Sequence, residues 1–295
     1  MYNDVLVSCC VLAYNSAKTI LETLDSIKAQ TYQNIELIIS DDYSTDNTVE
    51  LCREWIEQNG KRFVRVELLT VDHNTGICAN CNRVLNASQG VWRKGIAADD
   101  KLLPNCVKDF MEFVATNPDA RWISSNMRVY KETFEECNYL SNSFTAERSF
   151  FELTAEEQFK KIVTANHIKA PSLFYSVALL REVGGYDNSY TFEDYPLYVR
   201  ILEKGYKCYF MDKETVCYRL HQSFSNSSDK LFNYNRSSEY RSFQENILFN
   251  YLSRRQIKRQ RHFWKIQDFI EQHGLNKKTK LMTFIYARLR IFYFR

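Results

Sequence analysis

Short apolar segments that end in polar or acidic residues recur along the first hundred positions. Apolar residues dominate Val5–Leu12 and Ile35–Ser40, and a third run over residues 94–100 ends in two aspartates. Short, nearly continuous apolar runs are typical of parallel strands that are buried on both faces. Between the first two runs, apolar residues recur at helical spacing over residues 20–27. This alternation predicts an α/β protein with a central, mostly parallel sheet flanked by helices.

The pattern beyond residue 100 continues the alternation of helices and strands. It predicts helices at about 103–116, 155–163 and 192–205, and strands at about 121–130, 207–211 and 215–220. Residues 131–151 are polar and aromatic without a clear period, which predicts a loop. The pair Gly184-Gly185 predicts the end of a further helix, followed by a turn.

Two acidic pairs directly follow predicted strands. Asp41-Asp42 comes after the second apolar run, and Asp99-Asp100 comes after the third. Ligands in open α/β sheets collect beyond the carboxyl ends of the strands, and Mg²⁺ and Mn²⁺ prefer oxygen ligands. Together the pairs predict a divalent cation that holds a diphosphate. For either pair alone, capping of the next helix is the simpler explanation, so the hypothesis depends on their convergence at one edge.

The composition is typical of a globular chain with reduced thiols. The chain has 295 residues, 45% of them apolar, and only 8 glycines and 4 prolines, which argues against linkers and disorder. Its nine cysteines, an odd number, fall largely within predicted strands and helices, which favours a cytoplasmic protein. Cys78 and Cys81 lack a second pair at zinc-ligand spacing. No secretory signal is visible, and no apolar stretch reaches the roughly 18 residues of a membrane-spanning helix.

Charge is distributed unevenly along the chain. Residues 253–295 contain twelve Lys or Arg residues and two acidic ones, so the remainder is acidic although the total is +3. Aromatic and aliphatic residues accompany these charges at largely helical spacing, which favours an anionic membrane surface as a partner. Packing of these helices on the rest of the chain or on a partner subunit is the alternative. Nucleic acid is not expected, because the body is acidic and no recognition motif occurs.

The turn after the first predicted strand argues against several nucleotide-binding classes. Residues 13–16 contain no glycine, whereas a dinucleotide-dependent oxidoreductase needs a glycine-rich turn there. A sugar-nucleotide pyrophosphorylase would carry a Gly-rich loop with Arg and Lys at the same place. A phosphate-transferring NTPase would need a Gly-Lys-Ser/Thr loop, which the sequence lacks.

Seven short segments follow one another in a characteristic order and spacing. They are Val11-Leu12-Ala13-Tyr14-Asn15, the stretch from Asp41 to Asp46, the stretch from Asn74 to Asn82, Ala97-Ala98-Asp99-Asp100, Gly184-Gly185-Tyr186-Asp187, Glu193-Asp194 and Tyr218-Arg219-Leu220-His221. This series resembles the family 2 glycosyltransferases, particularly bacterial enzymes that build capsular or surface polysaccharides, and the resemblance covers residues 4–225. The resemblance implies the GT-A nucleotide-diphospho-sugar transferase fold with a helical C-terminal extension.

The resemblance also implies a role for each matching position. Asp194 would be the general base, and Asp99 and His221 would bind Mn²⁺ or Mg²⁺. Nucleotide contacts would come from Ala13, Tyr14, Asp42, Asn74, Gly76 and Asn80, with the Tyr14 ring on the base and Asp42 accepting from a pyrimidine N–H. Gly185 and Glu193 would contact the acceptor. The implied reaction is inverting transfer of a hexosyl or N-acetylhexosaminyl group from a UDP-sugar to a glycan or lipid-linked acceptor.

The predicted organisation has three parts: a nucleotide-sugar half at 1–100, an acceptor half of the same domain at 101–224, and a basic, aromatic helical extension at 225–295. Ala97 departs from the family, which often has an aspartate two positions before the metal ligand. A catalytically inactive protein that binds a nucleotide or a partner is therefore the alternative function. The predicted location is cytoplasmic, with peripheral attachment to the inner face of the membrane as an option, and the sequence is compatible with a homo-oligomer.

Overall fold

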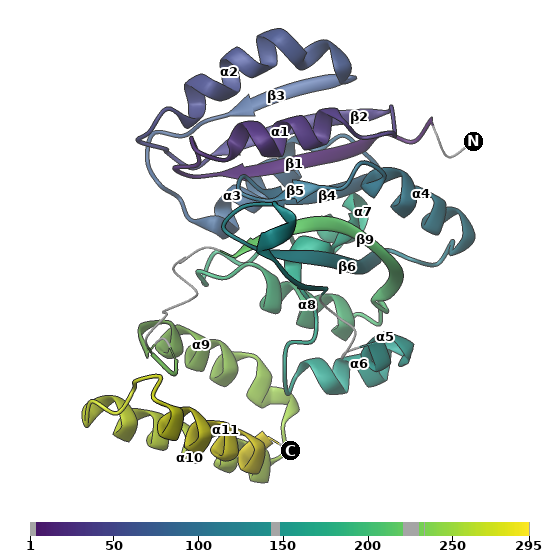
Figure 1. Cartoon of the computed structure of the whole chain (residues 1–295). Coiled ribbons are helices and arrows are strands. Elements are labelled where there is room, and N and C mark those ends of the chain that lie inside the picture. The colour runs from purple at the N-terminus through teal and green to yellow at the C-terminus, as the bar shows by residue number, and fades with distance from the viewer. Residues whose placement is uncertain (1–3, 143–147, 221–229, 233, 295) are drawn as a thin grey trace. The chain divides into compact units, whose positions relative to one another are not determined.

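The computed structural model describes residues 4–142, 148–220, 230–232 and 234–294 (Figure 1). Its contacts divide the chain into two compact units. The first contains Met1–Ile162 and His167–Arg219, and the second contains Val163–Asn166 and Leu220–Arg295. The predicted nucleotide and acceptor halves thus lie in the first unit, apart from residues 163–166 and 220–224. The predicted extension lies in the second.

Four parallel strands form the first half of the sheet, in the order β3-β2-β1-β4 (Figure 1). They are β1 (Val7–Ala13), β2 (Ile35–Asp41), β3 (Arg65–Leu69) and β4 (Trp92–Ala97). Every residue of β2 is buried, as its apolar run predicts. Leu12 of β1 pairs with both Ser40 of β2 and Ala97 of β4. The carboxyl ends of these strands are therefore level, and the two acidic pairs follow β2 and β4 at the same edge, on either side of β1.

Helices connect these parallel strands. They are α1 (Ile20–Lys28), α2 (Thr48–Asn59), which continues into a 3-10 turn η2 (Gly60–Arg62), and α3 (Ile77–Ala87). Each helix buries an apolar stripe at helical spacing, as Ile20, Leu24 and Ile27 of α1 illustrate. Helix α4 (Cys106–Thr116) follows β4 and the short strand β5 (Lys101–Leu102).

Antiparallel strands form the second half of the sheet, which continues from β4 in the order β8-β6-β9-β5. These strands are β8 (Phe174–Ser176), β6 (Trp122–Lys131) and β9 (Tyr209–Leu220), and β7 (Tyr139–Asn142) pairs with β6. The α/β class is confirmed, but the parallel pairing is confined to the first four strands.

Two sequence-based expectations for this half are wrong. Residues 207–211 and 215–220 are expected as separate strands, but one strand, β9, runs without a break from Tyr209 to Leu220. Its polar centre stays in the sheet because Asp212 accepts a hydrogen bond from Asn126 at 2.7 Å and Glu214 accepts one from Arg128 at 2.5 Å. The expected loop at 131–151 contains the turn η3 (Glu136–Asn138), β7 and the start of α5 (Arg148–Glu152).

The remaining elements of the first unit include α6 (Ala155–Ile162), the turn η4 (Ala170–Ser172), α7 (Val177–Glu182) and α8 (Asp194–Glu203). Ser176 caps α7 by accepting the N–H of Leu179. The chain leaves α7 through Gly184 and Gly185, both in the left-handed region. The predicted helix stop is thereby confirmed.

The second unit is helical in its described residues. It contains α9 (Tyr234–Asn246), the turn η5 (Leu248–Tyr251), α10 (Arg254–Gln272) and α11 (Lys280–Phe294). A capping box between Ser253 and Gln256 begins α10. Phe263 and Ile270 of α10 pack with Tyr286 and Tyr293 of α11 in one apolar cluster. In the part of the chain that the structure describes, no helix has the length and apolar character needed to cross a bilayer.

Candidate active site

The loops after β1 and β2 are fastened to each other at the edge of the sheet. The backbone N–H of Asn15 donates to Ser44 Oγ at 2.7 Å, and the Asn15 side chain accepts the Thr45 N–H at 2.8 Å. Asn15 adopts φ +49°, a conformation that asparagine tolerates better than most residues. Ala13 is buried at the end of β1, whereas Tyr14 is 52% exposed. The Tyr14 ring is therefore available for stacking.

Asp42 holds the loop that precedes α3. Its buried carboxylate accepts the Thr75 N–H at 3.1 Å, the Gly76 N–H at 2.8 Å, the Thr75 hydroxyl and an Arg83 N–H at 3.2 Å. Burial alone would raise the pKa of Asp42, but these hydrogen bonds lower it below the ordinary value. Asn74 donates to the Asp42 carbonyl at 3.1 Å. A pyrimidine N–H would have to displace one of these donors to reach the Asp42 carboxylate.

Two further predicted nucleotide residues have identifiable structural positions. Gly76 precedes α3 with φ +84°, which strains any residue with a side chain. Asn80 is buried, donates to the Ser40 carbonyl at 3.3 Å and accepts from Arg83 at 3.1 Å. Asn80 therefore joins α3 to the end of β2 through its amide.

The acidic pair after β4 is fixed by Arg219 at the end of β9. The Asp100 carboxylate is buried and accepts the Arg219 N–H at 2.9 Å, while Arg219 Nε donates to the Asp99 carbonyl at 2.7 Å. Arg219 also pairs with Glu22. Burial raises the pKa of Asp100 well above its ordinary value, and the neighbouring Asp99 raises it further. Asp99 is half-buried, so it is the more exposed carboxylate of the pair.

A cavity of about 300 Å³ brings together acidic residues that lie far apart in the sequence. Asp99, Asp100, Glu193 and Asp194 all line it. Its walls are mainly apolar and aromatic, formed by Leu12, Ile77, Cys81, Ile96, Pro171, Leu173, Tyr175, Tyr186, Tyr198 and Tyr218 among others. Of the remaining predicted site residues, Ala13, Tyr14, Asp42, Asn74, Gly76, Asn80 and Gly185 do not line this cavity, and His221 lies outside the described residues.

A further acidic pair, Glu193-Asp194, lies at the start of α8. Glu193 is the N-cap residue of α8 and Asp194 is its first residue, so the helix dipole stabilises both carboxylates. Asp194 Oδ1 accepts the Tyr195 N–H at 2.7 Å. The preceding turn is held by Asn82, whose Oδ1 accepts the Tyr186 N–H at 2.7 Å. A Cβ on Gly185 would lie 2.5 Å from that Oδ1, which explains this glycine sterically.

Three arginines that carry no recognisable motif of their own also shape this region. Arg83 connects Asp42 to Asn80, and Arg219 holds the Asp99-Asp100 turn. Arg93 lines the cavity from within β4. The signal that could have found Arg93 is a basic residue within a predicted buried strand, since basic side chains are almost never fully buried without a partner.

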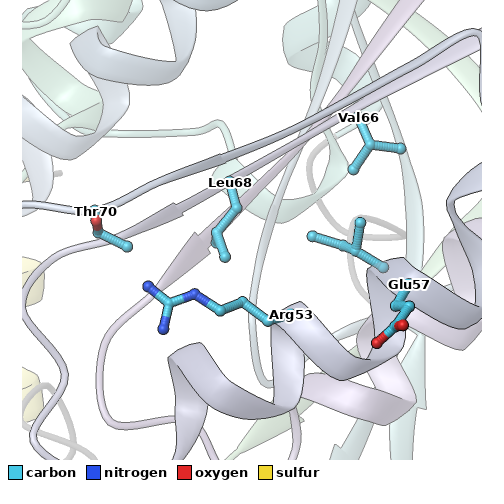
Figure 2. Close-up of a pocket in the computed structure, with 6 residues that line it drawn as sticks. Arg53, Glu57, Val66, Leu68 and Thr70 are labelled. Carbon is cyan, nitrogen blue, oxygen red and sulfur yellow. The ribbon is translucent and has the colours of Figure 1, made fainter.

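A second hollow, of about 420 Å³, lies between α2 and the edge strand β3 (Figure 2). Arg53 and Glu57 of α2 face Val66 and Leu68 of β3, and Thr70 just after β3, across it. It contains none of the predicted site residues. Its charged residues, Arg53 and Glu57, have opposite signs and do not form a recognisable catalytic or ligand-binding arrangement.

The oxygen donors around Asp99 fit a hard divalent cation. Mg²⁺ is commonly bound through one or two carboxylates together with substrate phosphates and water. Among the described residues, no cluster of three or more His, Cys, Asp or Glu side chains could enclose a metal ion. The described residues therefore fit Mn²⁺ or Mg²⁺ held through a carboxylate jointly with a diphosphate.

Comparisons with known proteins identify the family and the fold. The sequence matches the family described as glycosyl transferase family 2 over residues 8–175, more than half of the chain. An uncharacterized glycosyltransferase of Haemophilus influenzae is 24% identical over 258 residues, covering 86% of this chain and 76% of that protein. The Escherichia coli UDP-Glc:alpha-D-GlcNAc-diphosphoundecaprenol beta-1,3-glucosyltransferase WfaP is 27% identical over 219 residues, covering 73% of this chain and 78% of that protein.

Solved structures share the α/β fold. S. aureus TarS 1-349 in complex with UDP-GlcNAc matches with a TM-score of 0.58 and 19% identity, over 74% of this chain and 59% of that chain. A mannosyltransferase of Pyrobaculum calidifontis, in complex with GDP-Man and Mn²⁺, matches with a TM-score of 0.54 and 19% identity, over 75% of this chain and 57% of that chain. This chain thus spans less than two thirds of either solved chain. The predicted GT-A-like fold is confirmed, and the chain belongs to glycosyl transferase family 2.

Proposed function

We propose that this protein is an inverting, metal-dependent glycosyltransferase. It transfers a sugar from a UDP-sugar to a hydroxyl of a glycan or lipid-linked acceptor in surface polysaccharide synthesis. The observation that carries the proposal is the shared cavity of Asp99 and Asp194, one at the end of β4 and the other at the start of α8. The family match and this convergence favour an enzyme over an inactive nucleotide-binding protein.

The proposed chemistry divides between the two acidic positions. Asp194 accepts the proton of the acceptor hydroxyl, whose oxygen forms a bond to the anomeric carbon as the bond to UDP breaks. Attack from the face opposite UDP inverts the anomeric centre in one displacement. A divalent cation bound through Asp99 would supply Lewis-acid stabilisation of the charge that develops on UDP. His221 remains a proposed contributor to that site.

The nucleotide part of the proposal places UDP at the edge formed by β1 and β2. Tyr14 stacks on the base through its exposed ring. Asp42 and Asn74 order the loop that ends in Gly76, where the N-terminus of α3 favours a phosphate. Glu193 and Gly185 are proposed to position the acceptor. The protein is placed in the cytoplasm, which suits its nine free thiols, eight of them buried.

A thermal-shift screen of nucleotide sugars tests the proposed donor and metal. UDP and UDP-sugars at about 100 times Kd should raise the melting temperature by several degrees with Mn²⁺ or Mg²⁺, because binding there contributes about 2.7 kcal/mol. UDP should then be released slowly by hydrolysis without an acceptor, and EDTA should stop that release. Stabilisation by GDP but not UDP, or hydrolysis unaffected by EDTA, would contradict the proposal.

The C-terminal helices are proposed to bring the enzyme to an anionic membrane. Tyr286 and Tyr293 face the cluster with α10, but Leu281, Phe284 and Phe292 of α11 are 67%, 60% and 68% exposed. This exposed apolar surface lies among the basic residues of 253–295, a combination that suits anionic lipid.

Charge substitution provides a direct test of membrane binding. Lys277→Gln with Lys280→Gln should weaken sedimentation with phosphatidylglycerol vesicles about tenfold or more, since each lysine near the surface contributes about 1 kcal/mol. Lys108→Gln with Lys160→Gln, at exposed lysines of the first unit, is the matched control and should change little. Equal binding of all variants, or binding insensitive to salt, would refute the membrane role.

A further inference from the structure

The cavity floor carries a buried cation that the proposed chemistry does not use. Arg93 of β4 is 2% exposed and lines the cavity. Its Nη1 donates to the Tyr186 hydroxyl at 2.7 Å, and its guanidinium carbon lies 5.4 Å from the centre of that ring. Among the described residues, no carboxylate lies within ion-pair distance of Arg93, and its buried Nε has no hydrogen-bond partner.

The unused side of Arg93 has the shape of a carboxylate site. Tyr186 occupies Nη1, the thiols of Cys10 and Cys81 are the other hydrogen-bond partners of the guanidinium, and no oxygen atom of a described residue accepts from Nε or Nη2. These two nitrogens donate in parallel along one edge of the planar guanidinium, and this edge matches the two oxygens of a carboxylate. A lysine in the same place would lack this geometry.

Small residues keep the Nη2 end of this edge close to the cavity, while Nε itself is buried. Gly95 and Ala97 follow Arg93 on the same face of β4 and also line the cavity. A Cβ on Gly95 would already lie 3.6 Å from Arg93 Nη2, so a larger side chain would cover the guanidinium. Asp99 comes two residues after Ala97, the last residue of β4. Arg93 therefore lies nearer the amino end of the strand than the proposed metal ligand.

The groups that touch Arg93 do not neutralise its charge. Burial raises the pKa of Tyr186 above its ordinary value, although Arg93 itself lowers it. Burial likewise raises the pKa of Cys10 and Cys81, the two thiols beside the guanidinium. All three are neutral near pH 7. A buried cation that lacks an anionic partner is costly, and a bound anion would offset that cost.

We propose that Arg93 binds the carboxylate of a uronic acid, so that the transferred sugar or the acceptor sugar next to the reacting bond is acidic. The inference rests on the proposed function and defines its substrate class. Glu193 and Asp194 also line the cavity, and their charges disfavour a carboxylate elsewhere in it. The Arg93 edge is therefore the place where an acidic sugar fits, and it fixes the orientation of that sugar.

Matched sugar pairs test this inference in the full-length protein. The donor arm compares UDP-glucose with UDP-glucuronic acid and UDP-galactose with UDP-galacturonic acid, in the presence of Mn²⁺. The acceptor arm adds the methyl glycosides of the same four sugars to the protein with UDP and Mn²⁺. Calorimetry measures affinity in both arms. One arm should show at least about tenfold tighter binding of an acid than of its neutral partner, as a charge-assisted bidentate contact provides.

Substitutions locate that preference on the guanidinium. Arg93→Met should abolish the preference for the acid, and Arg93→Lys should restore only part of it. Arg53→Met, at an exposed arginine of α2, is the matched control and should keep the full preference. If Arg93→Met fails to fold, the wild-type pairs still decide the question. UDP alone must bind every folded variant equally, since a failure there counts against the proposed function. UDP binding with no acid preference in either arm would overturn the uronic acid proposal alone.

Discussion

Asp194→Asn is expected to lower the rate of UDP release from the donor sugar by about 10²–10⁴-fold, because a positioned general base typically contributes that much. In the absence of acceptor, water takes the place of the attacking hydroxyl, so the assay needs only the donor and Mn²⁺. Affinity for UDP should stay within about twofold of wild type, since Asp194 acts on the nucleophile. Asparagine retains an oxygen for the Tyr195 N–H, and the start of α8 should therefore be preserved.

The adjacent carboxylate provides the matched control. Glu193→Gln removes a negative charge from the same cavity and the same helix start. We expect it to raise the acceptor KM, with a much smaller effect on hydrolysis. If both substitutions reduce hydrolysis equally, the two carboxylates act through their combined negative charge in the cavity, and Asp194 is not a specific base. If Asp194→Asn loses UDP affinity and activity in proportion, Asp194 is a binding residue and the base assignment is wrong.

The first half of the fold is strongly determined by local sequence. The runs that become β1 and β2 are apolar on both faces, which only a central parallel strand accommodates. Their level ends then place Tyr14 and Asp42 at one edge together with the turn that follows β4. The second half depends on pairing between distant segments. Strand β9 continues through Asp212 and Glu214 only because β6 supplies partners for them, which no local pattern of β9 contains.

The candidate site shows the same division. The positions of Asp99 and Asp194 could be predicted because acidic residues follow recognisable strand and helix boundaries. The internal hydrogen bonds of Asp42 and Asn80 could not, because their common partner Arg83 reaches them only after α3 packs on β2. Arg93 was missed for a different reason. Strand β4 contains two adjacent basic residues, Arg93 and Lys94, and its sequence does not show which of them reaches a cavity. The structure places Arg93 in the cavity lining.

Asp99→Ala is expected to remove the metal dependence of UDP binding. The reason is geometric: both aspartates line the cavity, but Asp100 is buried and accepts the Arg219 N–H, whereas Asp99 is half-buried. Calorimetry should show that Mn²⁺ strengthens UDP binding by wild type but not by the variant. UDP release should fall about 10²-fold or more, because several kcal/mol of stabilisation of the leaving group are lost.

Ala97→Asp is the informative companion to Asp99→Ala, because it adds a carboxylate on the same face of β4, two residues before Asp99. If Asp99 is the ligand, the added carboxylate should tighten Mn²⁺-dependent UDP binding in an otherwise wild-type chain. In the Asp99→Ala background it should restore part of that binding. An unchanged response to Mn²⁺ in Asp99→Ala would remove Asp99 from the metal site. The Lewis-acid part of the mechanism would then have no ligand at the end of β4, although the Asp194 result would still stand.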